Sequence, residues 1–468
     1  MVLLVDKFFK LRENGTDVKT EILAGLTTFL TMAYIIFVNP SILSITGMDR
    51  GAVFVATIIA AAIGTFVMAF VANVPFAQAP GMGLNAFFTF TVVLGMGFTW
   101  QQALAMVFIC GILNILITVT KIRKMIIHAI PESLQYAISG GIGLFIAYIG
   151  IKQAHFIQFT GDAVNKIVAV GEGGVFQDVV PALVSFKDPV AQLALIGLVI
   201  TIILMLLKSK SAILIGILAT TVIGIFFNVT QIPTLSADMF KVPSLAPTFL
   251  QMDFAGLFGT PQKVFVALTT IFAFSLTDTF DTIGTFLGAG RKSGIFDEKD
   301  EESVEKGSGF SSKMEKALFA DATATSIGAI LGTSNTTTYV ESAAGISQGG
   351  RTGLTSVTTG VLFLLCLFIA PIAGMVPAAA TAPALIVVGI LMAESLSKIE
   401  WSDLEIGIPA FFTVAFMPFT YNITNGIAAG FIFYCIAKIF NKKAKDVHPI
   451  LYIVTALFII SYILNAFI

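Results

Sequence analysis

Long apolar runs follow one another along almost the whole chain, with short polar breaks between them. A run of about 20 apolar residues can cross a bilayer as a helix, so this pattern predicts a protein that crosses the membrane many times. The predicted spans lie near residues 20–45, 51–74, 81–97, 101–120, 133–151, 190–207, 211–228, 262–289, 315–333, 341–350, 353–374, 383–397, 404–420 and 422–440. One more apolar run covers residues 449–468, and its topology stays open.

The third and tenth apolar segments are short and interrupted. Pro75 to Pro80 favours extended backbone, and the β-branched and aromatic run Thr336 to Val340 favours a short strand. We expect each strand to lead into a half-helix, with Asn85 and Glu341 close to the two helix starts. Non-helical backbone at membrane depth is tolerated where protein covers it or where it lines a cavity. Its amide groups and helix N-termini can then face a ligand.

Seven spans lie on either side of the middle of the chain, which suggests an internal repeat. Ile196-Gly197 aligns with Ile406-Gly407 at one shift, and Leu26-Thr27-Thr28 aligns with Leu268-Thr269-Thr270 at another. Such short matches also arise by chance in so apolar a chain. If the repeat is real, an odd number of spans per half requires the two halves to be inverted, which is a recurrent transporter architecture.

Composition excludes a soluble globular protein. The chain is 56% hydrophobic and 12% charged, with a mean hydropathy of +0.92, so the expected fold class is an all-α polytopic membrane protein. Cys110, Cys366 and Cys435 lie inside apolar segments without paired spacing, which predicts no disulfide, metal or cofactor. The glycine-rich stretches lack the context of a nucleotide fingerprint, and no nucleic acid is expected as a partner.

Basic residues indicate the orientation. Most of the 27 Lys and Arg residues fall in loops on the same side as the N-terminus when the span count is even, which predicts a cytoplasmic N-terminus. No cleaved signal peptide is expected, because charged residues and no short apolar leader precede the first span. The expected location is the cell (plasma) membrane.

Three carboxylates inside or beside apolar segments are the candidate functional residues: Asp278, Asp281 and Glu341. A carboxylate at bilayer depth costs roughly 2.5 to 3.5 kcal/mol, so its presence needs a reason. Ser275, Asp278, Asp281 and Thr285 recur at intervals of three or four residues and form a polar stripe on one helix. The alternative is that an acid, Asp281 above all, only braces a neighbouring helix through Ser or Thr hydroxyls.

The surrounding residue types favour a neutral, N–H-rich solute or a cation as ligand. No Lys or Arg lies well inside a predicted span, which argues against an anion. Carboxylates accept hydrogen bonds from ring N–H and amino groups, and Asn85 can both donate and accept. Tyr339 and Phe87 could stack on a planar ring, although such aromatics are more often packing residues. Acids that meet in one site resist being ionised together, which makes proton coupling natural.

Three motifs carry a family resemblance. At Ala79–Phe87, Asp278–Thr285 and Gly332–Gly345 the chain resembles the AzgA-like purine permeases of the nucleobase:cation symporter-2 family, and the likeness extends from Gly15 to about Lys443. This resemblance implies a uracil-permease-like fold of fourteen spans in two inverted seven-span repeats, with two broken strand-helix segments. The final apolar run would be an additional C-terminal helix.

The resemblance also implies a division of labour. Residues 1–124 and 261–376 would form a core domain, and residues 125–260 and 377–468 a gate domain with the C-terminal segment. The core would carry purine and proton past the gate in an elevator-like motion. By motif, Asp278 and Glu341 look like the main purine-binding acids, Asn85 a polar binding residue and Asp281 a supporting acid. The proton would be the coupling ion, with the purine nucleobase and the lipid bilayer as partners and a homodimer as one candidate assembly.

The resemblance leaves the substrate open. Such permeases generally take hypoxanthine and guanine, and some take adenine. Ser342-Ala343-Ala344-Gly345 replaces the Asn-x-Gly pattern of the xanthine and uracil branches, which points away from those substrates. The alternatives are an adenine-preferring permease, an anion carrier of the same fold, a channel, and an intramembrane aspartyl protease. That last chemistry needs two aspartates on different helices, whereas Asp278 and Asp281 share one.

Overall fold

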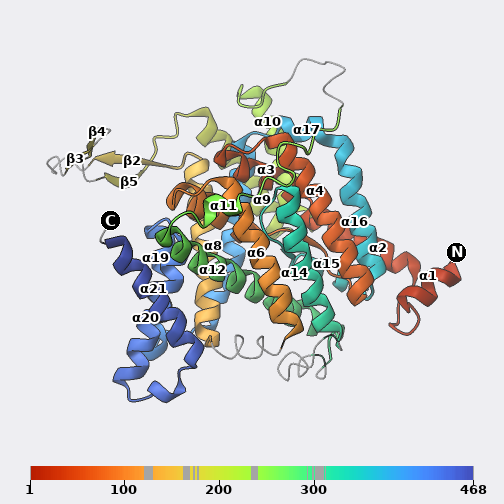
Figure 1. The fold of residues 1–468 in the computed structure, drawn as a ribbon. Helices are drawn as coiled ribbons and strands as arrows, with labels where there is room; N and C mark the ends of the chain where they lie inside the picture. The colour runs from red at the N-terminus through yellow and green to blue at the C-terminus, as the bar shows by residue number, and fades with distance from the viewer. Residues whose placement is uncertain are drawn as a thin grey trace.

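The structure is a computed structural model, and it describes residues 2–120, 130–161, 169–171, 174–176, 179–232, 241–291, 293–297, 300, 310 and 312–466. Helices dominate it, and most of them run side by side across the molecule (Figure 1). Within these residues, eight helices are long and apolar enough to cross a membrane, and shorter apolar helices accompany them. The prediction of an all-α polytopic fold is confirmed.

In the first half of the chain, a helix that is interrupted by a short break (α2 and α3) and the long helix α4 precede the first interrupted segment. Further long helices follow that segment. The elements in order are α1 (Val2–Phe9), α2 (Val18–Met32), α3 (Ile35–Leu43), η1 (Ser44–Thr46), α4 (Arg50–Val67), η2 (Met68–Ala72), β1 (Gln78–Pro80), α5 (Met82–Ala86), η3 (Phe87–Gly95), α6 (Trp100–Val119), α8 (Glu132–Gln153), β2 (Ile157–Gly161), β3 (Ala169–Gly171), β4 (Gly174–Phe176), β5 (Val179–Leu183), α9 (Pro189–Leu206), α10 (Ala212–Phe226) and α11 (Phe254–Leu257).

The second half has the same general order, and one further helix ends it. Its elements are α12 (Pro261–Thr285), η5 (Phe286–Arg291), α14 (Lys313–Leu331), β6 (Thr336–Thr338), α15 (Ser342–Ser347), α16 (Gly353–Leu365), η6 (Cys366–Ile369), α17 (Ala370–Met375), α18 (Ala378–Met392), η7 (Ala393–Lys398), α19 (Leu404–Phe419), α20 (Ile423–Phe440), η8 (Ala444–Asp446) and α21 (Pro449–Ala466).

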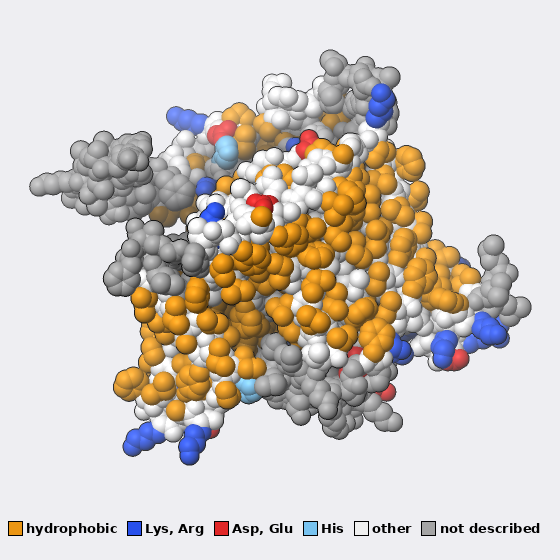
Figure 2. Space-filling view, viewed as in Figure 1, with side chains coloured by type: hydrophobic (Ala, Val, Ile, Leu, Met, Phe, Trp, Pro, Cys, Tyr) orange, Lys and Arg blue, Asp and Glu red, His pale blue; other side chains and the backbone are white. Residues whose placement is uncertain are grey.

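A broad apolar band covers the face shown in Figure 2, with Lys and Arg side chains toward its edges. Large apolar side chains are strongly exposed on several helices, for example Leu206 at 77%, Phe226 at 83% and Phe419 at 85%. Contiguous exposed apolar surface on this scale is unfavourable in water and suits lipid contact. The chain is therefore a multi-pass membrane protein.

The long helices pack in two groups. In one group α8 packs against α18 and α19, α19 packs against α20, and α9 packs against α10 and α18. In the other group α14 packs against α4 and α6, and α16 packs against α2 and α4. Gly143 and Gly389 let α8 and α18 approach closely, because a Cβ added at Gly389 would lie 2.5 Å from the Gly143 carbonyl oxygen. Between the groups, α5 contacts α8, η3 contacts α20, and α12 contacts both of these helices.

Two features differ from the hydropathy prediction. Strand β2 pairs with β5 and β3 pairs with β4, both antiparallel, in the connection between α8 and α9, where no strands were expected. Helix α18 begins at Ala378 rather than near residue 383, since Pro383 lies inside the helix instead of at its start. Pro383 lies in the second turn, where its missing N–H removes one backbone hydrogen bond without ending the helix.

Candidate functional site

The two interrupted segments meet at the centre of the site. Strands β1 and β6 form a two-stranded antiparallel sheet in which Ala79 pairs with Thr337. The Gly81 N–H donates to the Asn335 carbonyl at 2.9 Å, and the Tyr339 N–H donates to the Ala77 carbonyl at 3.0 Å. The prediction of two strand-helix segments is confirmed. Each strand satisfies the backbone groups of the other, which is what non-helical backbone at this depth requires.

A half-helix follows each strand. After β1 the chain enters α5 and continues through the π-helical segment η3, and after β6 it enters α15, with Glu341 as the N-cap residue. Asn85 lies in α5, so both predicted polar residues do lie near the start of a half-helix. The N-terminal amides of α5 and α15 therefore point toward the region around the sheet.

Glu341 is partly exposed and has one strong side-chain partner. The Tyr34 hydroxyl donates to Glu341 Oε1 at 2.5 Å. Tyr34 lies in the short break between α2 and α3. Val340 beside it is 59% exposed, and Asp281 on α12 is also exposed. Asp278 and Glu341 are the charged neighbours of Asp281. Asp281 and Glu341 thus share an accessible face, with one Glu341 oxygen free of the Tyr34 bond.

Asp278 has a different environment. Its side chain is fully buried, and its Oδ2 atom accepts hydrogen bonds from Asn114 at 3.2 Å, Thr325 at 3.0 Å and Asn335 at 3.3 Å. These donors come from α6, α14 and the approach to β6, so Asp278 ties three parts of the site together. Its Oδ1 atom is buried without a hydrogen-bond partner, which leaves one strong acceptor unsatisfied.

A fourth carboxylate, Asp321 on α14, was missed in the sequence. It is 4% exposed, and its Oδ1 atom accepts from Thr338 at 2.7 Å and Thr282 at 2.9 Å. The Asp321 backbone N–H donates to the Gln78 side-chain oxygen at 3.2 Å. The carboxylate therefore joins β6 to α12, and the Asp321 backbone joins β1 to α14. The signal was present, because Asp321 lies inside the apolar run 315–333 just as Asp278 lies inside residues 262–289.

The remaining predicted site residues are buried. Asn85 accepts a hydrogen bond from the Ser334 hydroxyl through its Oδ1 atom. The Tyr339 hydroxyl donates to the Pro80 carbonyl at 2.6 Å, and the Phe87 ring packs 4.4 Å from the Phe274 ring. Both aromatic rings therefore form part of the packing around the site, and stacking on a ligand stays a prediction.

The site is rich in hydrogen-bond acceptors and has no partner of positive charge among the described residues. No ion pair joins a described Lys or Arg to Asp278, Asp281, Asp321 or Glu341. In the described part of the chain, no group of His, Cys, Asp and Glu side chains has the arrangement of a metal site. Such a site suits a ligand that donates hydrogen bonds.

A site built on paired broken segments among membrane-spanning helices is typical of transporters. The sequence profile of the Permease family matches residues 19–429, and the chain belongs to this family. The chain is 42% identical to the adenine permease AdeP of Escherichia coli, covering 98% of this chain and 96% of that protein. It is 41% identical to the guanine/hypoxanthine permease PbuG of Bacillus subtilis, covering 97% and 99%. The resemblance noted in the sequence is confirmed, as is the prediction of a transporter and not an enzyme.

Solved structures show the same fold in more distant proteins. The transmembrane domain of the cyanobacterial bicarbonate transporter BicA superimposes with a TM-score of 0.59 at 16% identity, covering 90% of this chain and 96% of that one. This likeness supports the predicted uracil-permease-like architecture, and it leaves the substrate to be argued from the site.

Proposed function

We propose that this permease takes up purine nucleobases, hypoxanthine and guanine in the first place, together with protons. The observation that carries the proposal is the acceptor-rich site formed by Glu341, Asp281 and the unpartnered Oδ1 of Asp278. Purine bases present ring N–H and, in guanine, amino groups in one plane, and carboxylates are the strongest side-chain acceptors for them. Two relatives named for guanine and hypoxanthine transport, PbuG and PbuO, each align over 97% of this chain and 99% of their own length.

The ligand contacts divide between two depths. Glu341 and Asp281 face accessible space and would receive the base first, while Asp278 lies deeper and offers its free oxygen once the base is seated. Amide groups at the start of α5 can donate to the carbonyl oxygen of hypoxanthine or guanine. The first amides of α15 already donate to the carbonyls of Tyr339, Val340 and Glu341. Asn85 supports this arrangement from α5 through its bond with Ser334.

Proton coupling rests on the charge balance of the site. Three carboxylates lie within electrostatic range of one another, and no described Lys or Arg side chain neutralises them. Like charges this close are not all ionised together in a low-dielectric environment. A proton bound at one acid would accompany the neutral base across the membrane. No other cofactor is proposed.

The two helix groups favour an elevator-type motion. The core domain would comprise residues 1–124 and 261–376, and the gate domain residues 125–260 and 377–468. None of the four carboxylates lies on the group formed by α8, α9, α10, α18, α19 and α20: Asp278 and Asp281 are on α12, Asp321 is on α14, and Glu341 precedes α15. That group contacts the rest of the helices through a few elements, such as α5, η3, α12, α2 and α3. A site on one body can then move past the other. The proposed orientation has a cytoplasmic N-terminus in the plasma membrane.

An adenine preference is the second candidate, because the adenine permease AdeP is as similar to this chain as PbuG is. An anion carrier is disfavoured despite the shared fold with a bicarbonate transporter, since the described site offers carboxylates and no cationic side chain.

The test is uptake of labelled hypoxanthine by cells that lack their own purine permeases. Unlabelled guanine, adenine, xanthine and uracil compete in parallel, with and without an uncoupler. We expect Asp278→Asn and Glu341→Gln to abolish uptake while membrane insertion persists, and Glu13→Gln, on the exposed N-terminal segment, to leave it unchanged. Normal uptake in both site variants would refute the site. Competition by adenine alone would indicate an adenine-preferring permease. An uptake rate that does not change when the uncoupler is added would exclude proton coupling.

A further inference from the structure

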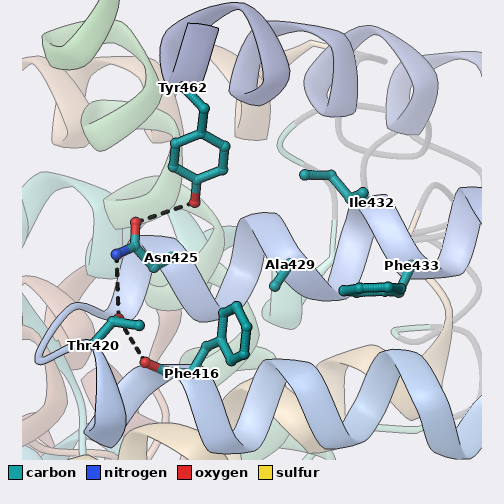
Figure 3. Close-up of a pocket in the computed structure, with 7 residues that line it drawn as sticks. All are labelled: Phe416, Thr420, Asn425, Ala429, Ile432, Phe433 and Tyr462. Carbon is teal, nitrogen blue, oxygen red and sulfur yellow. Dashed lines mark hydrogen bonds between the residues drawn. The ribbon is translucent and has the colours of Figure 1, made fainter. Parts of the chain in front are cut away.

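A groove outside the carboxylate site runs between α19, α20 and the C-terminal helix α21. It has a volume of about 310 Å³, within the range of small-ligand pockets. Figure 3 shows its lining, which comes from the three helices. The lining residues are Phe416, Thr420, Asn425, Ala429, Ile432, Phe433 and Tyr462.

Helix α21 closes one side of this groove because it runs antiparallel to α20. Three contacts in sequence show the direction: Cys435 Sγ lies 3.5 Å from Thr455 Oγ1, Phe431 packs on Phe458, and the Tyr462 hydroxyl bonds Asn425. The final apolar run, whose topology the sequence left open, therefore passes back along α20 through the apolar band. Helix α21 also contacts α12.

One end of the groove is polar. The Tyr462 hydroxyl donates to Asn425 Oδ1 at 3.1 Å, and Asn425 Nδ2 donates to Thr420 Oγ1 at 3.2 Å (Figure 3). This end lies where α19 finishes and α20 begins, which is the boundary of the spanning region. An amide nitrogen carries two N–H groups, so Asn425 retains one donor beyond the bond to Thr420.

The rest of the groove is apolar and leads away from that boundary toward the middle of α20. Ala429 and Phe433 follow Asn425 at intervals of four residues on one helix face, and Phe433 is held by stacking on Phe412 at 3.9 Å. The small side chain of Ala429 leaves the space in the centre. Polarity therefore falls along the groove in the direction in which it falls across one leaflet of a bilayer.

The surface around the groove is lipid-facing. Phe419 is 85% exposed, Ile436 42% and Ile463 50%, and these side chains lie on the same three helices. A groove that opens onto such a surface within a membrane span is filled by lipid tails rather than water. The matching polarity and surroundings select a phospholipid of the adjacent leaflet as occupant.

We propose that this groove binds one phospholipid, with an acyl chain along Ala429 and Phe433 and an ester carbonyl accepting the free N–H of Asn425. The lipid contacts all three helices and so fastens α21 to α19 and α20. The site is separate from the carboxylates and does not depend on which solute the permease carries.

The test uses phosphatidylethanolamine carrying a photoactivatable group in its acyl chain, added to membranes containing the full chain, with adducts mapped by mass spectrometry. We expect adducts on the groove residues of the unmodified protein and at least a tenfold loss in Ala429→Phe, which fills the groove. Leu218→Phe, a similar change at an exposed position on α10 away from the groove, should label as the unmodified protein does.

A second variant keeps the proposal testable if Ala429→Phe folds poorly. Asn425→Leu keeps the groove apolar and removes the amide, and we expect several-fold weaker labelling. Undiminished labelling in both variants, or no labelling of groove residues in the unmodified protein, would overturn the proposal. Crosslinks from groove residues to a second copy of the chain would identify a subunit as occupant instead of lipid.

Discussion

The two strand-helix units have the same backbone plan and opposite surroundings. In the first unit, β1 and α5, every residue from Gln78 to Met82 is buried, and so is Asn85, whose side chain bonds Ser334. In the second unit, Val340 is 59% exposed and Glu341 is partly exposed beside the exposed Asp281. The buried first unit carries the neutral amide of Asn85, and the partly exposed second unit carries the carboxylate of Glu341. Burying an isolated charge is far more costly than burying a bonded amide, which accounts for the difference.

In the proposed function, the first unit would act as a wall and the second as the surface that faces the ligand. Asp321 contacts both units, because its carboxylate accepts from Thr338 of the second unit and its backbone N–H donates to Gln78 of the first. Asp278 would belong with the wall through its Oδ2 bonds and with the ligand surface through Oδ1, which has no hydrogen-bond partner. Acidic residues at membrane depth would then serve two purposes within one site.

Replacing Asp321 should have the largest effect, because its carboxyl group holds β6 and β6 pairs with β1. In Asp321→Asn, an amide replaces the acceptor of two side-chain hydrogen bonds, with a loss on the order of 2 kcal/mol in stability. We expect hypoxanthine uptake to fall on the order of 100-fold and the detergent-solubilised protein to unfold at lower temperature. Unchanged uptake and unfolding temperature would show that Asp321 does not hold the strands.

Removing the Tyr34 hydroxyl tests the open unit alone. In Tyr34→Phe, Glu341 loses its 2.5 Å hydrogen bond, and a bond to a charged group is typically worth about 1.5 to 3 kcal/mol. We expect uptake to fall about tenfold and the unfolding temperature to fall less than in Asp321→Asn, because only one hydrogen bond is lost. Tyr148→Phe, a tyrosine away from the carboxylates, serves as the matched control. An equal loss in both variants would contradict the assigned role of Tyr34.

Neutralising Asp281 distinguishes a ligand-facing acid from a structural brace. Asp281 is exposed, so Asp281→Asn should lower uptake about fivefold through weaker ligand binding and leave stability nearly unchanged. Measuring the Michaelis constant and the maximal rate separately checks this, with the Michaelis constant expected to rise. A fall in unfolding temperature at unchanged Michaelis constant would instead support the bracing interpretation.

The smallest effect is expected in the covered unit. Ser334→Ala removes the hydroxyl that donates to Asn85, and one neutral hydrogen bond contributes about 1 kcal/mol. We expect uptake to fall about threefold, and Ser397→Ala on the exposed η7 segment to leave it unchanged. A loss as large as that of Tyr34→Phe would mean that the two units contribute equally to the ligand surface.

Much of this arrangement could be predicted from hydrophobic pattern. The apolar runs correspond to the helices, and Pro75, Pro80 and Thr336 to Val340 indicated the two broken segments. The same reasoning singled out Asp278, Asp281 and Glu341 but passed over Asp321 in an equally apolar run. Tyr34 carried no local signal, because its partner Glu341 is far away in the chain and only their proximity gives it a role.

The amino-acid sequence by itself determined that the chain lies in a membrane, where it crosses, and where two crossings are broken. It did so because the need to bury apolar length and to pair backbone groups in lipid acts on each segment locally. Only the tertiary structure decided which acids are enclosed, which face open space, and that the last helix returns along α20. Those outcomes depend on donors such as Asn114, Thr325 and Tyr462, which reach their partners only when distant helices pack together.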